Sequence, residues 1–340
     1  MTAPASEGAR VLTITVTYKS ATWTAKSLEA LEAERARSPG LDLRAIVVDN
    51  ASGDSAELAP LIAQRRWGDW ATLITADRNG GFAYGNNVAF ARAYASGPEN
   101  VPDYFYLLNP DASVRPGAVG ALVEFLEQHP AAGLAASSIE EADGELWPYA
   151  FRFPSWASEV ESGLAFGLVT KVLDDRTVRR KMTGDVPTQV DWFPGASMML
   201  RREVVDEIGG MDESYFLYFE ETDYLLRAKE AGWTAWYVPA SRVVHAAGQS
   251  TGVTTRRAQP RRLPDYWFES RRRYFAKNHG LTYAAAADVA ALAAYALGAV
   301  KAGLQRRPTV PNFLGDLLRH SVVWPKNRGV EPVRQFKPAG

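Results

Sequence analysis

Runs of β-branched and other apolar residues alternate with stretches of helical composition through the first part of this chain. The runs are Val11–Tyr18, Leu43–Val48, Ala71–Thr75 and Tyr104–Leu108. Each has the length and composition of a buried strand, and helix formers at helical spacing separate the runs. Strands that alternate with helices form a mostly parallel sheet with right-handed crossovers. We therefore predict an α/β fold, with a Rossmann-like, mostly parallel sheet flanked by helices.

Polar residues gather at the ends of these runs. They are Tyr18, Asp49, the stretch Arg78–Asn87 and the stretch Asn109–Asp111. The carboxyl ends of parallel strands share one edge of a sheet, where ligands bind. A carboxylate such as Asp49 suits ribose hydroxyls or a base edge, and glycines at a helix start allow anions to approach free N–H groups. Together the clusters predict a nucleotide site, although each alone is also typical of a helix cap or a turn.

The run Tyr104–Leu108 ends abruptly in Asn109-Pro110-Asp111. Pro110 cannot donate to a strand ladder, so the strand stops there, with a short amide and a short carboxylate at its carboxyl end. Such oxygen donors suit Mg²⁺ or Mn²⁺, with substrate phosphates completing the coordination. A plain turn is the simpler interpretation of the same three residues.

A second acidic cluster follows the aromatic run Tyr215–Phe219. Glu220, Glu221 and Asp223 open a predicted helix, and the helix dipole alone favours acids in a first turn. The functional interpretation is that one of them is a general base, accepting a proton from an attacking hydroxyl. The residues by themselves do not choose between the three carboxylates.

His245 is the one histidine of four that follows a predicted strand, Trp233–Pro239, with Gly248 and Ser250 just beyond it. An imidazole there suits a metal and a diphosphate, and a structural histidine is the alternative.

Two segments before this strand have a less regular pattern. We predict Val190–Arg202 to be a single strand bent at Pro194-Gly195. The aromatic stretch Trp147–Pro187 is predicted to be an irregular excursion that covers the sheet or an acceptor site.

Composition excludes several classes of protein. The 340 residues carry a net charge of −1 and no cysteine, so disulfides and thiolate metal sites are excluded and nothing global favours nucleic acid. Met1–Arg10 is polar and lacks the apolar segment of a signal peptide. We expect a cytoplasmic chain with no nucleic-acid partner, and a homo-oligomer is compatible with the sequence.

From Thr255 the chain becomes basic and aromatic, so we divide it into a catalytic region, 1–255, and a helical C-terminal extension, 256–340. Leu281–Val300 is Ala-rich and interrupted by Asp288. It is long enough to span a membrane, but an aspartate inside a bilayer is costly. We expect a helix that packs on the body or lies on the inner face of the cell membrane, with its basic flanks near anionic lipid.

In order along the chain, these motifs resemble family 2 glycosyltransferases of the GT-A fold, and more narrowly their bacterial rhamnosyltransferase and galactofuranosyltransferase branch. The resemblance covers about residues 10 to 275. It is carried by Val16-Thr17-Tyr18, Val47–Ser52, Asn79–Asn87, Leu108–Asp111, Gly195-Ala196 and Phe219–Asp223. It implies an inverting transfer from a nucleotide sugar, with Mg²⁺ or Mn²⁺ on the diphosphate.

The resemblance also implies a role for each matching residue. Nucleotide-sugar contacts would come from Thr17, Tyr18, Asp49, Asn50, Arg78, Gly81, Asn86, Asn109 and Gly195. Asp111 would bind the metal, supported by His245. Asn109 stands where the family has the first Asp of Asp-x-Asp, and Glu220-Glu221 stands where it has Glu-Asp. Glu221 is therefore the expected base, with Glu220 and Asp223 as rivals.

The donor implied is dTDP-rhamnose or UDP-galactofuranose, and the acceptor is a glycan or lipid-linked saccharide of the cell envelope. A nucleotidyltransferase is disfavoured because Tyr18-Lys19-Ser20 lacks glycines, and a dehydrogenase because no Gly-x-Gly-x-x-Gly follows the first strand. The departures at Asn109 and Glu221 keep open a non-catalytic nucleotide-sugar or glycan-binding protein.

Overall fold

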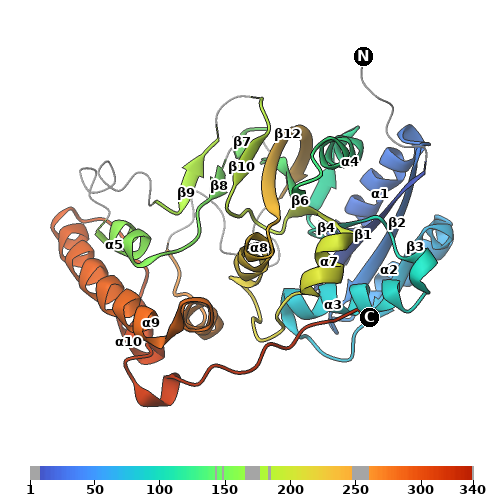
Figure 1. Ribbon diagram of the computed structural model, residues 1–340. Coiled ribbons are helices and arrows are strands. Elements are labelled where there is room, and N and C mark those ends of the chain that lie inside the picture. Colours follow the sequence, from blue (N-terminus) through green and yellow to red (C-terminus); the bar gives the residue numbers. More distant parts are fainter. Residues whose placement is uncertain are drawn as a thin grey trace.

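The computed structural model describes residues 8–141, 144–147, 149–164, 177–182, 185–246 and 260–338. A twisted sheet with helices on both faces forms one side of the molecule (Figure 1). The other side consists of three helices, α5 (Trp156–Leu164), α9 (Asp265–Leu304) and α10 (Phe313–His320). The predicted α/β class and the helical C-terminal extension are thus confirmed.

The first half of the chain alternates strands and helices as predicted. Its elements are β1 (Ala9–Thr17), α1 (Ala21–Arg37), β2 (Leu41–Asp49), α2 (Ser55–Gln64), β3 (Ala71–Thr75), α3 (Gly81–Tyr94), β4 (Tyr104–Leu108), β5 (Ala112–Val114) and α4 (Ala118–Gln128). β1 pairs in parallel with both β2 and β4, and β2 pairs in parallel with β3. The carboxyl ends of these strands therefore meet at one edge.

The second half completes a mixed sheet in the order β10-β12-β6-β11-β4-β1-β2-β3. Its elements are β6 (Ala132–Glu140), β7 (Leu146–Trp147), β8 (Tyr149–Phe151), β9 (Arg179–Lys181), β10 (Thr188–Val190), β11 (Ser197–Arg201), α7 (Arg202–Ile208), α8 (Glu220–Glu230) and β12 (Thr234–His245). β11 lies antiparallel between β4 and β6, whereas β12 is parallel to β6. β5 pairs with β12, β7 with β6, and β8 with β9.

Two predictions for the middle of the chain are wrong. The stretch Val190–Arg202 is not one bent strand: β10 ends at Val190 beside β12, and β11 begins at Ser197 in the middle of the sheet. Pro194 cannot donate to a ladder, so the chain leaves the sheet between them. The stretch Trp147–Pro187 is not wholly irregular, because its described parts include β8, α5 and β9.

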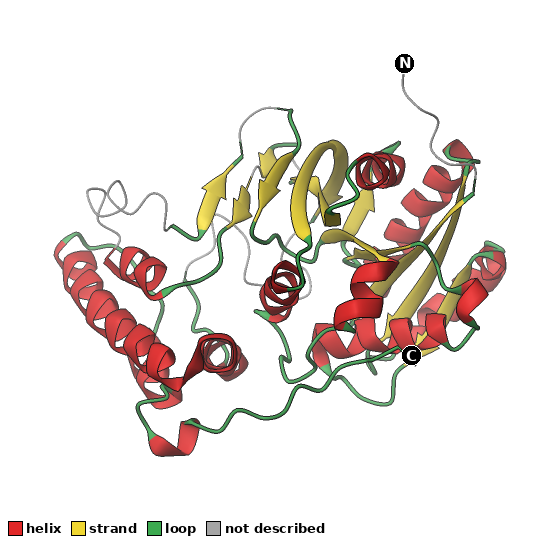
Figure 2. Ribbon diagram, viewed as in Figure 1, coloured by secondary structure: helices red, strands yellow, loops and turns green. Residues whose placement is uncertain are grey.

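Both faces of the sheet are covered by helices (Figure 2). Buried side chains of α1, α2 and α4 form one core with the sheet, and those of α3, α7 and α8 form the other. In β1, Val11 faces the first core while Leu12 and Ile14 face the second. Burial on both faces explains why the strands have continuous apolar runs rather than an alternating pattern.

The C-terminal extension returns to the sheet at its end. α9 consists of two helical halves that meet at Gly280, where φ is +83°. After α10 the chain runs back below α3 and α7 (Figure 1), and the carbonyl of Phe336 accepts a hydrogen bond from Gly210 N at 2.8 Å. The boundary predicted at 255/256 lies outside the described residues, so the division into two domains stays a prediction.

Candidate active site

A cavity of about 280 Å³ opens at the carboxyl ends of β1, β2 and β4, and we call it the strand-end cavity. It is lined by Val16, Tyr18, Asn50, Asn79, Gly81, Phe82, Asn109, Pro110, Phe216, Leu217 and Tyr266. Four residues predicted to contact a nucleotide sugar are therefore brought together there: Tyr18, Asn50, Gly81 and Asn109. The other predicted site residues are not among those that line this cavity.

Asn50 holds the turn that begins α3. Its Nδ2 donates to Asn79 Oδ1 and to the carbonyl of Gly81, both at 3.0 Å, and its Oδ1 accepts from Gly80 N at 3.3 Å. Gly81 has φ +83°, and an added Cβ would overlap the carbonyl oxygen of Phe216. The position therefore requires glycine, because the loop before α8 packs directly on the start of α3.

Gly81→Ala is expected to lower the free energy of unfolding by about 3 kcal/mol, because it combines a strained φ with a backbone clash. Gly120→Ala is the matched control: Gly120 lies inside α4, where an added Cβ meets nothing within 4 Å. That control should be stabilising by about 0.5–1 kcal/mol. Denaturant unfolding measures both, and an unaffected Gly81→Ala protein would contradict the tight packing of the two segments.

Thr17 and Asp49 are the last residues of β1 and β2 and do not line the strand-end cavity. Thr17 donates to Asp54, and Asp49 accepts from the backbone N–H groups of Ser52 and Ser55, each at 2.8 Å. Burial alone raises the pKa of Asp49, but these hydrogen bonds outweigh it, so the pKa is lowered and the carboxylate stays ionised. Its contacts are those of a cap at the start of α2, and its binding of a nucleotide stays a prediction.

Arg78 and Asn86 also lie outside the cavity lining. The half-exposed guanidinium of Arg78 stacks 4.0 Å from the ring centre of Tyr84 and lies 3.6 Å from Glu213 Oε2. Asn86 is fully buried and donates to the carbonyl of Phe82 at 2.9 Å. Its Oδ1 has no hydrogen-bond partner among the described residues. Asn86 thus supports the wall residue Phe82, whereas Arg78 stays accessible beside α3.

Asp111 and His245 lie together, because β5 and β12 are neighbours. Nε2 of His245 is 3.1 Å from Asp111 Oδ1 and 3.4 Å from Asn109 Nδ2. Gly248 and Ser250 lie outside the described residues. Within the described part of the chain, no three His, Asp or Glu residues converge as a metal site. One carboxylate and one imidazole suit a divalent cation that takes its other ligands from a diphosphate and water.

Glu220 and Glu221 begin α8, and their carboxyl groups influence each other's pKa. Glu220 is buried, and its Oε2 has no partner among the described residues. Burial raises the pKa of both, and the charge of Glu221 raises the pKa of Glu220 further. The interaction with Glu220, in contrast, lowers the pKa of Glu221. The pair therefore favours a proton on Glu220 and a negative charge on Glu221.

The backbone directly before α8 is strained. Tyr218 and Phe219 have φ values of +69° and +67°, a conformation that costs about 1–3 kcal/mol for each residue. The first half of α9 holds this loop in place: Ser270 Oγ donates to the carbonyl of Leu217 at 3.0 Å, and the rings of Tyr218 and Tyr266 stack. The C-terminal extension thus fixes where the Glu220–Glu221 pair lies.

Asp223 has different surroundings from Glu221. It is fully buried and accepts hydrogen bonds from Lys277 Nζ at 2.7 Å, Tyr215 Oη at 3.1 Å and Arg227 Nε at 3.2 Å. A carboxylate paired in this way ties α8 to α9 and is not free to accept a proton from a substrate. The contacts of Asp223 are therefore those of a structural ion pair.

A two-residue connection joins the acidic pair on α8 to the Asn109–Asp111 turn. Gly195 N lies 3.3 Å from Glu221 Oε1, and the carbonyl of the next residue, Ala196, accepts from Asn109 N at 3.0 Å. An added Cβ on Gly195 would lie 3.0 Å from the ring of Phe82. Because Phe82 and Asn109 line the strand-end cavity, both acidic centres meet beside it.

The sequence pattern did not identify Phe216, Leu217 and Tyr266 as site residues. Tyr266 belongs to the first turn of α9, where the sequence shows aromatic residues among arginines. That mixture of residue types was the only available signal, and it did not indicate which strand edge the segment would reach.

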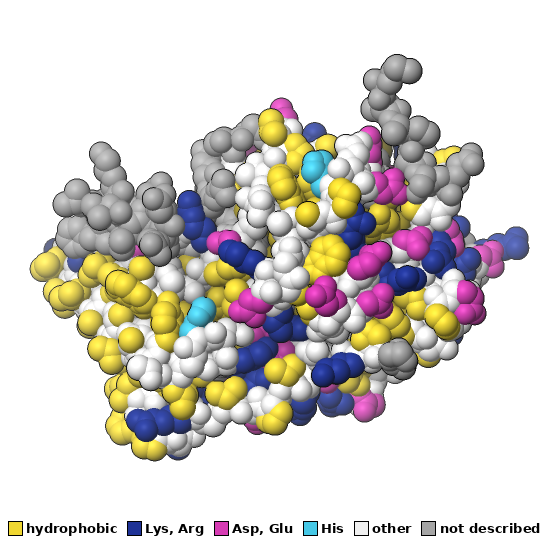
Figure 3. Space-filling model, in the orientation of Figure 1, with side chains coloured by type: hydrophobic (Ala, Val, Ile, Leu, Met, Phe, Trp, Pro, Cys, Tyr) yellow, Lys and Arg dark blue, Asp and Glu magenta, His cyan; other side chains and the backbone are white. Residues whose placement is uncertain are grey.

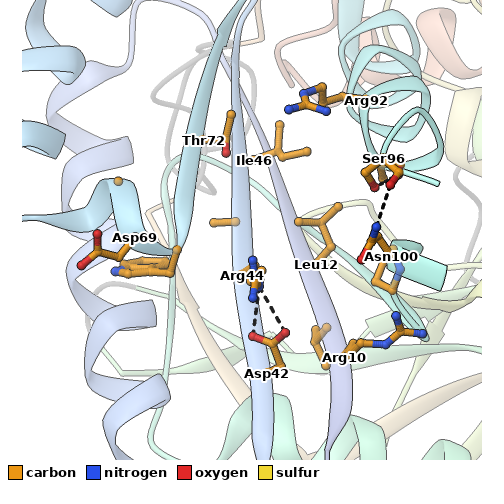
Figure 4. Close-up of a pocket in the computed structure, with 16 residues that line it drawn as sticks. Arg10, Leu12, Asp42, Arg44, Ile46, Asp69, Thr72, Arg92, Ser96 and Asn100 are labelled. Carbon is orange, nitrogen blue, oxygen red and sulfur yellow. Dashed lines mark hydrogen bonds and ion pairs between the residues drawn. The ribbon is translucent and has the colours of Figure 1, made fainter. Parts of the chain in front are cut away.

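A larger cavity, of about 380 Å³, lies at the other end of the strands (Figure 4). Arg10 and Leu12 of β1 and Arg44 and Ile46 of β2 contribute to its lining, and Arg44 pairs with Asp42 at 3.1 Å. None of the predicted site residues is among those that line it. Ligands of open α/β sheets bind at the carboxyl ends of the strands, so the strand-end cavity is the candidate active site.

Comparison with known sequences gives a family match and two informative relatives. The profile of glycosyl transferase family 2 matches residues 13–209. N-acetylglucosaminyl-diphospho-decaprenol L-rhamnosyltransferase of Mycobacterium tuberculosis is 28% identical over 211 residues, which are 61% of this chain and 67% of that protein. Rhamnosyltransferase WbbL of Escherichia coli is 27% identical over 168 residues, or 49% of this chain and 61% of that protein.

Two solved structures have a similar fold. GalNAc-T7 with UDP, GalNAc and Mn²⁺ superposes with a TM-score of 0.57 at 12% identity, over 92% of this chain and 57% of that one. The mannosyltransferase PcManGT of Pyrobaculum calidifontis with GDP-Man and Mn²⁺ gives 0.51 at 18% identity, over 94% and 82%. These similarities show a GT-A-like fold for the chain.

Proposed function

The chain belongs to glycosyl transferase family 2, and we propose that it is an inverting rhamnosyltransferase. The proposed donor is dTDP-rhamnose, and the proposed acceptor is a hydroxyl of a lipid-linked cell-envelope saccharide. The two rhamnosyltransferase relatives support the sugar, and the diphospho-decaprenol in the name of the first supports a lipid-linked acceptor. We place the reaction at the cytoplasmic face of the membrane.

The observation that carries this proposal is the meeting of two acidic centres beside one cavity. In an inverting displacement, the base and the leaving diphosphate lie on opposite sides of the anomeric carbon. Glu221 on α8 supplies a carboxylate for one side, and the Asn109–Asp111 turn with His245 supplies donors for the other. The hydrogen bonds through Gly195 and Ala196 fix their relative position.

Glu221 is the proposed general base and accepts the proton of the acceptor hydroxyl as the oxygen attacks the sugar. Glu220, whose pKa is raised further by the neighbouring charge, is the proposed protonated partner that orients the carboxylate of Glu221. Tyr18 and Phe216 both line the cavity, and we assign Tyr18 the role of offering an aromatic surface to the nucleotide base. Asp111 and His245 would hold a bound Mg²⁺ or Mn²⁺, whose charge would offset that of the departing diphosphate.

The rate should depend on pH through the Glu220–Glu221 pair. The base must be ionised, and burial raises the pKa of Glu221. We therefore expect kcat/KM to fall as the pH decreases through this raised pKa, at a higher pH than the value of about 4.3 for a free glutamate. Glu220→Gln removes the neighbouring acid and should change the pH at which kcat/KM falls. A rate that stays constant down to the ordinary glutamate pKa would contradict the buried base.

Donor identity is tested by calorimetry with dTDP-rhamnose, UDP-galactofuranose, UDP-glucose and GDP-mannose, each with Mn²⁺ and again with chelator, followed by turnover on a lipid-linked acceptor. We expect dTDP-rhamnose to bind, to lose affinity on chelation and to be turned over. Binding of UDP-galactofuranose alone would replace the donor in this proposal. Binding without turnover on any acceptor would favour a non-catalytic nucleotide-sugar-binding protein.

A further inference from the structure

The second half of α9, residues 281–304, exposes an apolar face. Val289, Leu297, Val300 and Leu304 are 58%, 63%, 65% and 83% exposed. Their spacing places them on one side of the helix, with alanines between them. Hydrophobic side chains gather on this part of the surface (Figure 3). A water-facing helical surface ordinarily carries charged or polar residues, so this face has the composition of a contact surface.

The opposite side of the same helix is fixed to the protein by buried charges. Asp288 accepts from Arg271 Nη1 at 2.6 Å and from Ser321 Oγ at 2.7 Å. Arg271 also pairs with Glu159 of α5 at 3.0 Å. By length and composition alone α9 could cross a membrane. Crossing would break these buried ion pairs, at a high cost in free energy, so the contacts favour a helix that lies along a surface.

The apolar face ends in positive charge. Arg306 and Arg307 follow its last residue, Leu304, and no acidic residue occurs from Val289 to Arg307. Arg306 and Arg307 are exposed. Apolar side chains that enter the acyl region, next to cations at the level of the headgroups, are typical of helices that bind anionic membrane surfaces.

We propose that the outer face of residues 289–304, with Arg306 and Arg307 at its end, docks on an anionic lipid bilayer while α9 lies along the membrane. A bilayer fits better than a second copy of this chain, because an anionic surface complements Arg306 and Arg307 and a second copy of the same face does not.

Docking through α9 also has a consequence for the site. The first half of the helix contributes Tyr266 to the strand-end cavity. The docked helix therefore holds that cavity near the membrane, where a lipid-linked acceptor would be. This orientation rests on the proposed function, whereas the docking itself does not.

The test is co-sedimentation of the full chain with vesicles of phosphatidylcholine and of an equal mixture of phosphatidylcholine and phosphatidylglycerol. Val289→Glu with Val300→Glu should weaken binding to the mixed vesicles by about tenfold or more. Arg306→Gln with Arg307→Gln should weaken it by about tenfold on mixed vesicles only. Val186→Glu is the matched control, because Val186 is 71% exposed and lies outside this face.

Wild-type protein that stays in the supernatant with mixed vesicles would overturn the proposal. Equal binding of the wild type and the double glutamate variant to mixed vesicles would also overturn it. So would a wild-type protein that does not bind vesicles and is a dimer in sedimentation velocity, if the double glutamate variant is a monomer. If the double variant loses its melting transition, Leu297→Glu gives the same comparison. No readout involves turnover, so the docking can fail while the proposed activity holds, and the reverse.

Discussion

Glu221→Gln is expected to lower kcat by about 10³-fold while the affinity for the nucleotide-sugar donor stays unchanged. Glutamine keeps the shape of the side chain and can still meet Gly195 at the edge of the strand-end cavity. It cannot accept the proton of the acceptor hydroxyl, so only the chemical step is lost. Single-turnover rates and calorimetric donor binding on the same preparation separate the two effects.

The neighbouring carboxylates provide the controls for this experiment. Glu220→Gln should keep a hydrogen-bond donor toward Glu221 and lose less activity than Glu221→Gln. Asp223→Asn should act on stability, lowering the free energy of unfolding by about 3 kcal/mol, because it weakens the buried pairs with Lys277 and Arg227. A folded Asp223→Asn protein without activity, beside a Glu221→Gln protein at the wild-type rate, would reverse the assignment.

The part of the site built on β1, β2 and β4 could be predicted because it depends on sequence patterns within each strand and on their parallel pairing. Each strand is recognisable from its apolar run, and parallel pairing brings the carboxyl ends to one edge whatever the rest of the chain does. Tyr18, Gly81 and Asn109 were placed together on this argument, Asn50 was added by the family resemblance, and all four line one cavity. The same argument placed Asp111 at the end of β4.

For Thr17 and Asp49, the sequence could not distinguish a role in nucleotide binding from a structural role such as capping the next helix. A carboxylate after a strand has the same sequence signature whether it meets a ribose or caps the next helix. Here the backbone N–H groups of Ser52 and Ser55 satisfy Asp49. The small polar residues in the loop after Asp49 are the signal that favoured the cap.

Long-range features were the ones that the residues did not reveal. The antiparallel insertion of β11 between β4 and β6 depends on pairing between segments far apart in the chain. The arrival of Tyr266 in the cavity wall likewise depends on how α9 packs against the loop before α8. Neither arrangement leaves a periodic pattern in the local sequence, so composition and residue spacing could not predict either of them.

Asp111→Ala is expected to weaken Mn²⁺-dependent donor binding by about 100-fold. With Asn109 in place of an acidic residue, the turn at the end of β4 offers one carboxylate, and His245 is its neighbour at 3.1 Å. Loss of Asp111 would leave a neutral amide and an imidazole, a donor set without the negative charge that a hard divalent cation favours. Calorimetry with dTDP-rhamnose, with and without Mn²⁺, measures this loss.

The comparison between variants decides whether the effect belongs to the metal. His245→Ala should weaken the same binding less than Asp111→Ala, since it removes a ligand without removing a charge. Asp42→Ala is a charge-matched control, because Asp42 is partly exposed and pairs with Arg44 at the other end of the strands. Donor affinity in chelator should be the same for all of these proteins. An Asp111→Ala protein that binds donor with Mn²⁺ as tightly as the wild type would remove this carboxylate from the cation site, and with it the assignment of the Asn109–Asp111 turn to the leaving diphosphate.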